Sequence, residues 1–228
     1  MDITLILLWI LATLTITSLS GVLAKRYGVE YIISVVVALV VIANVIASKI
    51  VVVGSLFVPA AVIVYASTFL LTDIISEKWG KQQARKAVWA GFYANIILVV
   101  AVSIAVYWPS APFASEFSES FSSVLGMIPR VVLASMIAYL VSQHHDIFAF
   151  HWWKNKTGGR HLWLRNIAST VVSQAIDTGM FITIAFYGVM DIVPLLIGQY
   201  VIKLIIAIID TPFLYAISWF MDKIPSKD

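Results

Sequence analysis

Long apolar runs separated by short polar stretches make up most of this chain. A helix needs about 20 apolar residues to cross the hydrocarbon core of a bilayer, and seven runs approach or exceed that length. They cover residues 3–24, 31–48, 59–76, 87–107, 130–150, 166–187 and 194–220. The pattern predicts an all-α integral membrane protein, a bundle of about seven (six or seven) transmembrane helices in a single domain over residues 1–228.

Three stretches depart from this pattern. Residues 49–58 are apolar but too short to cross, and Gly54 and Pro59 punctuate them, which predicts a short hairpin or a re-entrant segment. Residues 108–129 hold two glutamates and several serines, which is typical of an outer loop or a surface helix. Residues 151–165 combine tryptophans with basic residues, as anchors at the membrane interface do.

The basic residues are sorted by side. All but three of the 15 lysines and arginines lie in alternate connections, after the first, third, fifth and seventh runs; the exceptions are Lys49, Arg130 and Lys203. The positive-inside rule places these connections in the cytoplasm. We therefore expect the N-terminus outside and the C-terminus inside.

Composition agrees with the run pattern and excludes several function classes. The chain is 61% hydrophobic and 12% charged, whereas soluble domains have about 25% charged residues. A lipid bilayer must therefore solvate much of its surface, and we expect this to be the cell membrane. No cysteine is present, which excludes disulfides and thiolate metal sites. Phosphate-loop, nucleophile-elbow and His-Glu-x-x-His motifs are missing from the sequence. We expect no enzyme, no cofactor or metal site and no nucleic-acid partner.

Two charged residues interrupt the last two apolar runs. Asp177 lies eleven residues into the run 166–187, about 16 Å from its start, and Lys203 lies nine residues into the run 194–220, about 14 Å from its start. Because the runs enter from opposite sides of a core about 30 Å thick, both residues have nearly the same depth. A charge there costs several kcal/mol unless it faces a partner or a cavity. An Asp177–Lys203 ion pair is available if the two helices are neighbours.

Further polar side chains follow the same helix faces. Gln174 precedes Asp177 by three residues, and Asp210 follows Lys203 by two helical turns. Asn44 lies in the second run, where an amide needs a partner. Structural glue between helices is the competing explanation, but such hydrogen bonds are often worth less than about 1 kcal/mol and do not require buried charge. We therefore favour a binding site between helices near the bilayer midplane.

Polar residues near the ends of runs allow two interpretations. For Asp73, Asp146 and Arg130, a solvated helix end explains the position as well as a function does. The histidines within residues 144–151 lie close to Asp146 in the sequence, but an interfacial stretch without firm geometry favours a solvated surface over a metal site.

An ordered set of short motifs between about residues 40 and 220 resembles the queuosine precursor transporter family, also known as the vitamin uptake transporter family. The motifs are Asn44, Ser48-Lys49, Pro59, Thr68-Phe69-Leu70-Leu71-Thr72-Asp73, Trp79-Gly80, Ala84-Arg85, Arg130, Ala134-Ser135, Ala138-Tyr139, Gln143, Asp146, Ala168-Ser169-Thr170, Asp177-Thr178, Ile184-Ala185-Phe186 and Lys203-Leu204-Ile205. The resemblance implies import of a 7-deazaguanine: preQ0, preQ1 or queuine. The polar positions that it matches are Asn44, Asp73, Arg130, Gln143, Asp177 and Lys203. Asp210 and the first run do not match, so a role for Asp210 rests on spacing alone.

The chemistry of a 7-deazaguanine suits these residues. Its N1–H and exocyclic amine are adjacent donors that one carboxylate can accept, and its O6 accepts from an ammonium or amide group. We expect Asp177 on the donor edge, with Lys203 offsetting its charge or donating to O6. Asn44 and Gln174 would orient the ring, and Phe181 or Tyr200 would stack on it.

Two other functions stay open at this point. The chain could be the substrate-binding subunit of a vitamin importer driven by a partner ATPase. A more distant alternative is a retinal-binding seven-helix photoprotein with Lys203 as the attachment site, but an aspartate one turn before that lysine is lacking. The sequence does not decide between the three deazaguanines, between facilitated, proton-coupled and partner-driven import, or between a single chain and a homodimer.

Overall fold

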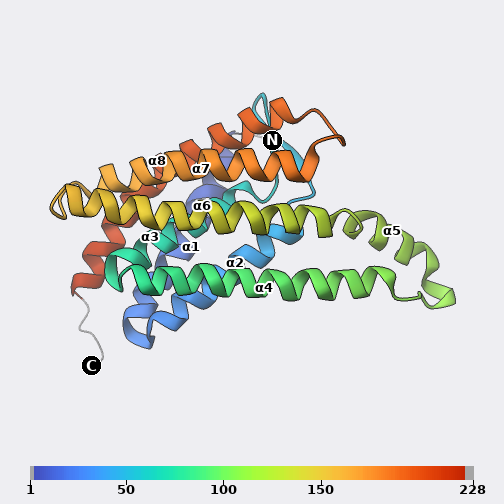
Figure 1. Ribbon diagram of the computed structural model, residues 1–228, viewed down its shortest axis with the longest axis horizontal. Coiled ribbons are helices and arrows are strands. Elements are labelled where there is room, and N and C mark those ends of the chain that lie inside the picture. The colour runs from blue at the N-terminus through green and yellow to red at the C-terminus, as the bar shows by residue number, and fades with distance from the viewer. Residues whose placement is uncertain (1–2, 224–228) are drawn as a thin grey trace.

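The computed structural model describes residues 3–223, with the side chains of that range apart from residues 3–7, 162 and 166. Helices account for nearly all of it, with one hairpin of two strands (Figure 1). In chain order the elements are α1 (Ile3–Tyr27), α2 (Val29–Ile46), β1 (Ile50–Val53), β2 (Leu56–Pro59), α3 (Val62–Lys78), α4 (Lys81–Tyr107), η1 (Pro112–Ala114), α5 (Ser115–Leu125), α6 (Ile128–Lys156), α7 (Leu162–Phe186) and α8 (Ile192–Lys223). The all-α membrane fold predicted from the sequence is confirmed.

Each predicted apolar run corresponds to one long helix, α1–α4 and α6–α8. Within the described residues, six of these helices are long and apolar enough to cross a membrane, and α3 is the one that is not. With 17 residues, α3 is about 25 Å long. It begins at Val62 and not at residue 59 as predicted, because residue 59 ends β2 and residues 60–61 form a turn.

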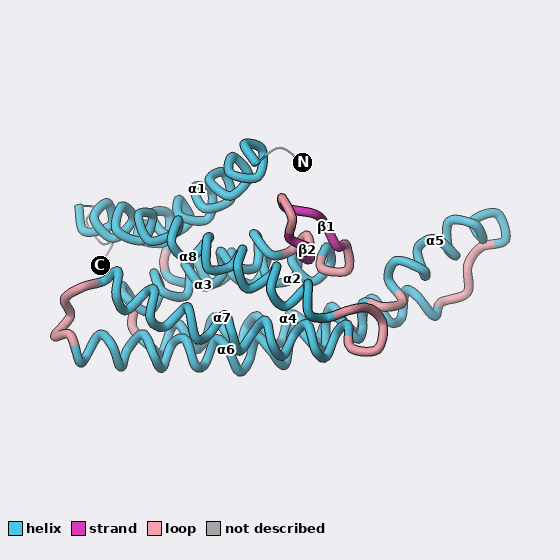
Figure 2. The backbone as a smooth tube through the Cα atoms, turned by 90° about the horizontal axis from the view of Figure 1, so that it is seen from above, coloured by secondary structure: helices cyan, strands magenta, loops and turns pink. Residues whose placement is uncertain are grey.

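The short helix α3 is the centre of the bundle. Fourteen of its 17 residues are buried, and it packs against α1, α2, α4, α6 and α8. Figure 2 shows it between α1 on one side and the layer of α6 and α7 on the other. Its buried serines, threonines and Asp73 therefore face other helices and not lipid, which is the environment in which polar groups within a membrane can find partners.

The β1–β2 hairpin covers one end of the bundle. Its strands pair antiparallel from Ile50 opposite Pro59 to Val53 opposite Leu56, and the turn uses Gly54 at φ +62°, a conformation that glycine adopts readily. The hairpin rests on α8 at Gly198, where an added Cβ would lie 2.2 Å from the carbonyl oxygen of Phe57. Of the two alternatives predicted for residues 49–58, the structure has the hairpin.

The opposite end gathers the connections rich in lysine and arginine. The α1–α2, α3–α4 and α6–α7 connections and the end of α8 lie together at the left of Figure 1. We call this the basic end and the opposite one the hairpin end. The charge bias predicts that the basic end is cytoplasmic.

Helix α5 lies outside the bundle, at the far right of Figure 1. None of its residues is buried, and it joins the extended ends of α4 and α6. The surface helix predicted within residues 108–129 is therefore present. In the predicted interfacial anchor, residues 151–165, Trp152 and Trp163 are exposed near the basic end.

Candidate functional site

A pocket lies between α2, α3, α6, α7 and α8, next to the end of the hairpin. Its lining divides into an apolar and a polar part. The apolar residues are Ala43, Ala47, Pro59, Ala61, Val62 and Phe181, and the polar residues are Asn44, Tyr65, Ser135, Asp177, Gln199 and Lys203. An apolar pocket with a few converging polar groups is the usual form of a small-molecule site.

The two mid-run charges meet in this pocket. Lys203 of α8 donates to Asp177 Oδ2 on α7, and both side chains are almost fully buried. The other carboxylate oxygen, Oδ1, accepts hydrogen bonds from Tyr65 and Ser142, each at 3.0 Å. Helices α3, α6, α7 and α8 thus converge on one carboxylate. The depth estimate from the sequence is consistent with this contact.

Tyr65 adds an aromatic surface beside the ion pair. Its ring centroid lies 5.2 Å from Lys203 Nζ, within range of a cation–π contact. The ring also packs edge-on against Tyr139, with centroids 5.9 Å apart. A planar ligand in the pocket would meet Tyr65 and Phe181 as its aromatic neighbours.

Amide side chains occupy two of the three remaining polar positions, and Ser135 is the third. Asn44 donates to the Oδ1 atom of Asn95 on α4 at 2.7 Å and also lines the pocket. Gln199 reaches Thr178 at 3.5 Å. These groups can donate to or accept from a polar ligand edge, so the pocket offers both signs of hydrogen-bonding partner.

Four predicted site residues line the pocket, namely Asn44, Asp177, Phe181 and Lys203. Two others lie on the pocket-forming helices but outside the lining: Gln174 is buried, and Tyr200 is half-buried with its hydroxyl 3.5 Å from the Val171 carbonyl oxygen. The predicted contact of Gln174 or Tyr200 with a ligand stays a prediction.

The other four lie further from the pocket. Arg130 is exposed and donates to the carbonyl oxygens of Ile184 and Tyr187 at the end of α7. Gln143 of α6 accepts a hydrogen bond from Thr72 of α3 at 3.1 Å. Asp73 and Asp210 are buried nearer the basic end.

One sequence interpretation is wrong in part. A solvated helix end does not describe Asp73 or Asp146, which are 1% and 0% exposed. Counting along the sequence put both near the ends of their runs. However, α6 continues to Lys156 and α3 is shielded by its neighbours, so both carboxyl groups lie inside the bundle.

Sequence reasoning missed Tyr65, Ser142 and Asn95. Asn95 interrupts the apolar run 87–107 as Asn44 interrupts its own run, and the same argument could have found it. Nothing in the sequence distinguishes Tyr65 from the many aromatic residues that face lipid. Ser142 is a small hydroxyl of the kind that membrane helices commonly satisfy within their own backbone.

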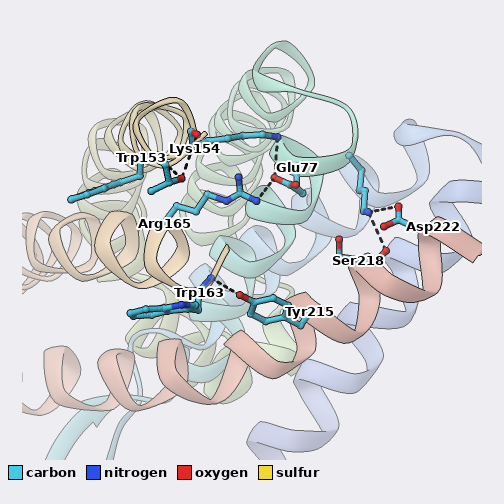
Figure 3. A network of polar contacts seen from close by, with 10 residues as sticks. Glu77, Trp153, Lys154, Trp163, Arg165, Tyr215, Ser218 and Asp222 are labelled. Atoms are coloured by element: carbon cyan, nitrogen blue, oxygen red, sulfur yellow. Dashed lines mark hydrogen bonds and ion pairs between the residues drawn. The ribbon is translucent and has the colours of Figure 1, made fainter. Parts of the chain in front are cut away.

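A second polar cluster ties the basic end together (Figure 3). Glu77 of α3 accepts from Lys154 of α6 at 3.0 Å and from Arg165 of α7 at 3.1 Å. Lys78 bridges to Asp222 of α8 at 2.6 Å. Arg165 is only 2% exposed, an unusual environment for a guanidinium. These contacts hold α3, α6, α7 and α8, four of the five pocket-forming helices, together at this end.

The fold and the site define a class: a multi-pass membrane protein with a mainly apolar pocket between its helices, in which a few polar groups converge on a buried ion pair. Comparison with known proteins is consistent with this class. Residues 59–217 match the family described as "Putative vitamin uptake transporter". The chain belongs to this family of membrane transporters.

Curated relatives give the same indication. The chain is 35% identical over 159 residues to a "Probable queuosine precursor transporter" of Bacillus subtilis (strain 168), an alignment that covers 68% of this chain and 69% of the relative. A protein of the same name from Haemophilus influenzae (strain ATCC 51907 / DSM 11121 / KW20 / Rd) is 28% identical over 123 residues, covering 54% of this chain and 49% of that protein. No solved structure matches the chain.

Proposed function

We propose that this protein imports a 7-deazaguanine precursor of queuosine, such as preQ0, preQ1 or queuine, and binds it in the pocket beside Asp177 and Lys203. The observation that carries the proposal is the buried ion pair lining a pocket inside the membrane. Buried charge of this kind is characteristic of substrate pathways. The relatives named as queuosine precursor transporters supply the ligand class.

The hydrogen-bonding capacity of Asp177 limits how the ligand can bind. A carboxylate accepts about four hydrogen bonds, and Asp177 already accepts three, from Tyr65, Ser142 and Lys203. One ligand donor can take the remaining position. Accepting both N1–H and the exocyclic amine requires one present donor to turn away. The Tyr65 hydroxyl is the candidate, because its ring also lines the pocket and can stay against the ligand.

Lys203 and the amide side chains would then form hydrogen bonds with the acceptor atoms of the ligand. The Lys203 ammonium has three protons and donates one to Asp177, so it can also donate to the ligand O6. Asn44 and Gln199 line the pocket and can bond to the ring nitrogens. Adenine carries an amine where guanine carries O6, so a donor of adenine would face the ammonium group of Lys203, which can only donate. We expect discrimination against adenine for this reason.

The two ends of the bundle suggest how the ligand enters and leaves. The hairpin lies next to the pocket through Pro59, whereas the Glu77–Arg165 and Glu77–Lys154 pairs close the basic end. Entry past the hairpin and release through the basic end would give import if the basic end is cytoplasmic, as the charge bias predicts.

A substrate-binding subunit driven by a partner ATPase stays the alternative function. A homodimer stays a prediction that the mass of the protein in nanodiscs would check. Uptake into liposomes that contain only this protein separates the two functions. Binding without uptake under those conditions would favour the partner-driven importer.

The direct test measures binding and uptake of preQ0, preQ1 and queuine by the full-length protein, with adenine and guanine as controls. We expect at least one deazaguanine to be bound and imported in preference to adenine. Asp177→Asn should abolish both activities in protein that is still folded in the membrane. Uptake by Asp177→Asn at the wild-type rate would contradict the proposed binding role.

A further inference from the structure

Two buried carboxyl groups face each other between the pocket and the basic end. Asp73 of α3 and Asp146 of α6 are within hydrogen-bonding reach of each other, and they are 1% and 0% exposed. We call them the carboxyl pair. It lies outside the pocket lining, so the proposed function leaves it without a role.

The hydrogen bonds of the pair do not balance if both groups are ionised. The three oxygens Asp146 Oδ1, Asp146 Oδ2 and Asp73 Oδ2 are buried, and the donors within reach of Asp146 are the neutral hydroxyls of Ser169 and Ser173. An ionised carboxylate can only accept, so two of them cannot bond to each other. With one proton, one group becomes a donor to the other. Two ionised carboxyl groups that face each other inside the protein are very costly, which favours the singly protonated pair.

Neighbouring charges do not replace this proton. Arg165 of α7 acts on Asp73, but its Nη2 is bound to Glu77 at 3.1 Å, and Asp210 of α8 adds a further carboxyl group beside Asp73. His145 is engaged with Ser173, with 2.9 Å between Nδ1 and Oγ. The titratable and charged groups that face this region from the surrounding helices are thus Asp210, Arg165, Glu77, Lys154, His145 and His151.

We propose that the carboxyl pair of Asp73 and Asp146 is a proton-binding site, and that its proton is carried with the substrate so that import is proton-coupled. The proposal rests on the proposed function for its substrate. In each cycle, one carboxylate takes a proton that arrives from the hairpin end. The same group later returns that proton to water at the basic end.

Polar side chains connect the pair with the pocket. Thr72, next to Asp73 on α3, donates to Gln143, which lies three residues before Asp146 on α6. Gln143 in turn reaches Thr68, one turn nearer the pocket, at 3.5 Å. This polar layer lies between the ion pair and the carboxyl pair and provides hydrogen-bonding groups through an otherwise apolar interior.

Arg165 connects the pair with the basic end. Its Nε and Nη1 atoms are buried without an acceptor, while Nη2 holds Glu77. When the carboxyl pair loses its proton, its second negative charge competes with Glu77 for this guanidinium. A shift of Arg165 towards the pair would weaken the Glu77 contact and loosen the basic end, which links proton release to ligand release.

The test uses the full-length protein in liposomes with a trapped pH indicator. Valinomycin and equal potassium on both sides hold the membrane potential at zero, so only the pH gradient can drive uptake. The probe is the deazaguanine that binds best. For one proton per ligand, an outside pH one unit lower should support up to about tenfold accumulation, because equal concentration ratios carry equal free energy. Ligand addition should acidify the interior, and a protonophore should abolish accumulation.

Variants assign the coupling to the pair. Asp146→Asn, which imitates the protonated group, should still bind ligand and exchange labelled for unlabelled ligand, but should no longer accumulate it or move protons. Glu119→Gln on the exposed helix α5 is the matched control and should behave as wild type. If Asp146→Asn does not fold, Asp73→Asn is measured in the same way, and proton entry with the wild-type protein tests the coupling without any variant.

The two proposals fail in different ways. No binding of any deazaguanine by the wild-type protein would overturn the proposed function. Binding and exchange without proton entry or pH-driven accumulation would overturn the proton site and leave the proposed function intact. Accumulation by Asp146→Asn and Asp73→Asn with the wild-type pH dependence would show that the proton binds elsewhere, and would also overturn the assignment.

Discussion

Replacing Lys203 with methionine tests whether the Asp177–Lys203 pair serves the fold or the ligand. Methionine fills much of the same volume without charge, so Lys203→Met leaves the Asp177 carboxylate, 1% exposed, without its counter-ion. Breaking a buried ion pair from one side costs about 3–5 kcal/mol. Because Tyr65 and Ser142 still donate to Asp177, we expect a loss of unfolding free energy near the lower limit, about 3 kcal/mol.

Asp177→Asn breaks the same pair from the other side. It leaves the Lys203 ammonium buried, and the new amide keeps one oxygen for the hydroxyls of Tyr65 and Ser142. The double variant Asp177→Asn/Lys203→Met removes both charges together. Neutral replacements of a buried pair are often harmless to stability, so we expect the double variant within about 1 kcal/mol of wild type.

Unfolding of the four proteins in the same mixed micelles, together with ligand binding by each, completes the test. We expect both single variants to be destabilised and the double variant to recover, while all three fail to bind the deazaguanine. Recovery of binding and uptake along with stability in the double variant would refute the reasoning, because the pair would then be structural glue. A loss below about 1 kcal/mol in the single variants would also contradict it, since that is the value of a hydrated pair.

Three further substitutions test separate parts of the structure. Gly198→Ala should displace the hairpin, because its Cβ would lie 2.2 Å from the Phe57 carbonyl oxygen, and should weaken ligand binding in a titration. Gly179→Ala on α7, where a Cβ meets nothing within 4 Å, is the control in that titration. Asn95→Leu leaves the Asn44 amide without its acceptor and should lower the unfolding free energy by about 1–3 kcal/mol, whereas an unchanged stability would show that water replaces that bond. Arg165→Gln should cost about 2 kcal/mol, since it removes a buried charged hydrogen bond to Glu77, which keeps Lys154 as a partner. Lys78→Gln should cost less than about 1 kcal/mol, since its partner Asp222 is 70% exposed. Equal losses in the last two variants, measured by the same unfolding assay, would contradict the assigned difference in burial.

The cost of buried charge is the reason that the centre of the site could be predicted. Asp177 and Lys203 are charged residues inside runs that are otherwise apolar, and few environments in a membrane tolerate them. Depth could be counted from helix rise alone because the two runs are long and regular. Which helices are neighbours depends on packing, so the ion pair itself required the structure.

Residues whose type is common in membrane helices could not be assigned from the sequence. Tyr65 contributes both a hydrogen bond and a ring to the site, but aromatic residues also form the belts at both membrane surfaces. Arg165 is one of several basic residues in the same connection, and only the structure distinguishes it as the buried one. The hairpin could not be assigned either, because the short apolar stretch of residues 49–58 fits a strand pair or a re-entrant segment equally well.

The properties that make α3 the least typical span also explain its place in the mechanism. It is shorter than the other long helices and carries Thr68, Thr72, Asp73 and Glu77 on successive turns. Exposing these polar side chains to lipid would be costly, but protein surrounds α3 almost completely, so they contact α6 and α7 instead. Each polar layer from the pocket to the basic end therefore includes a group from α3. Ligand binding, protonation of the carboxyl pair and movement of Arg165 therefore all act on α3. A shift of this helix at one polar layer can change the contacts at the others.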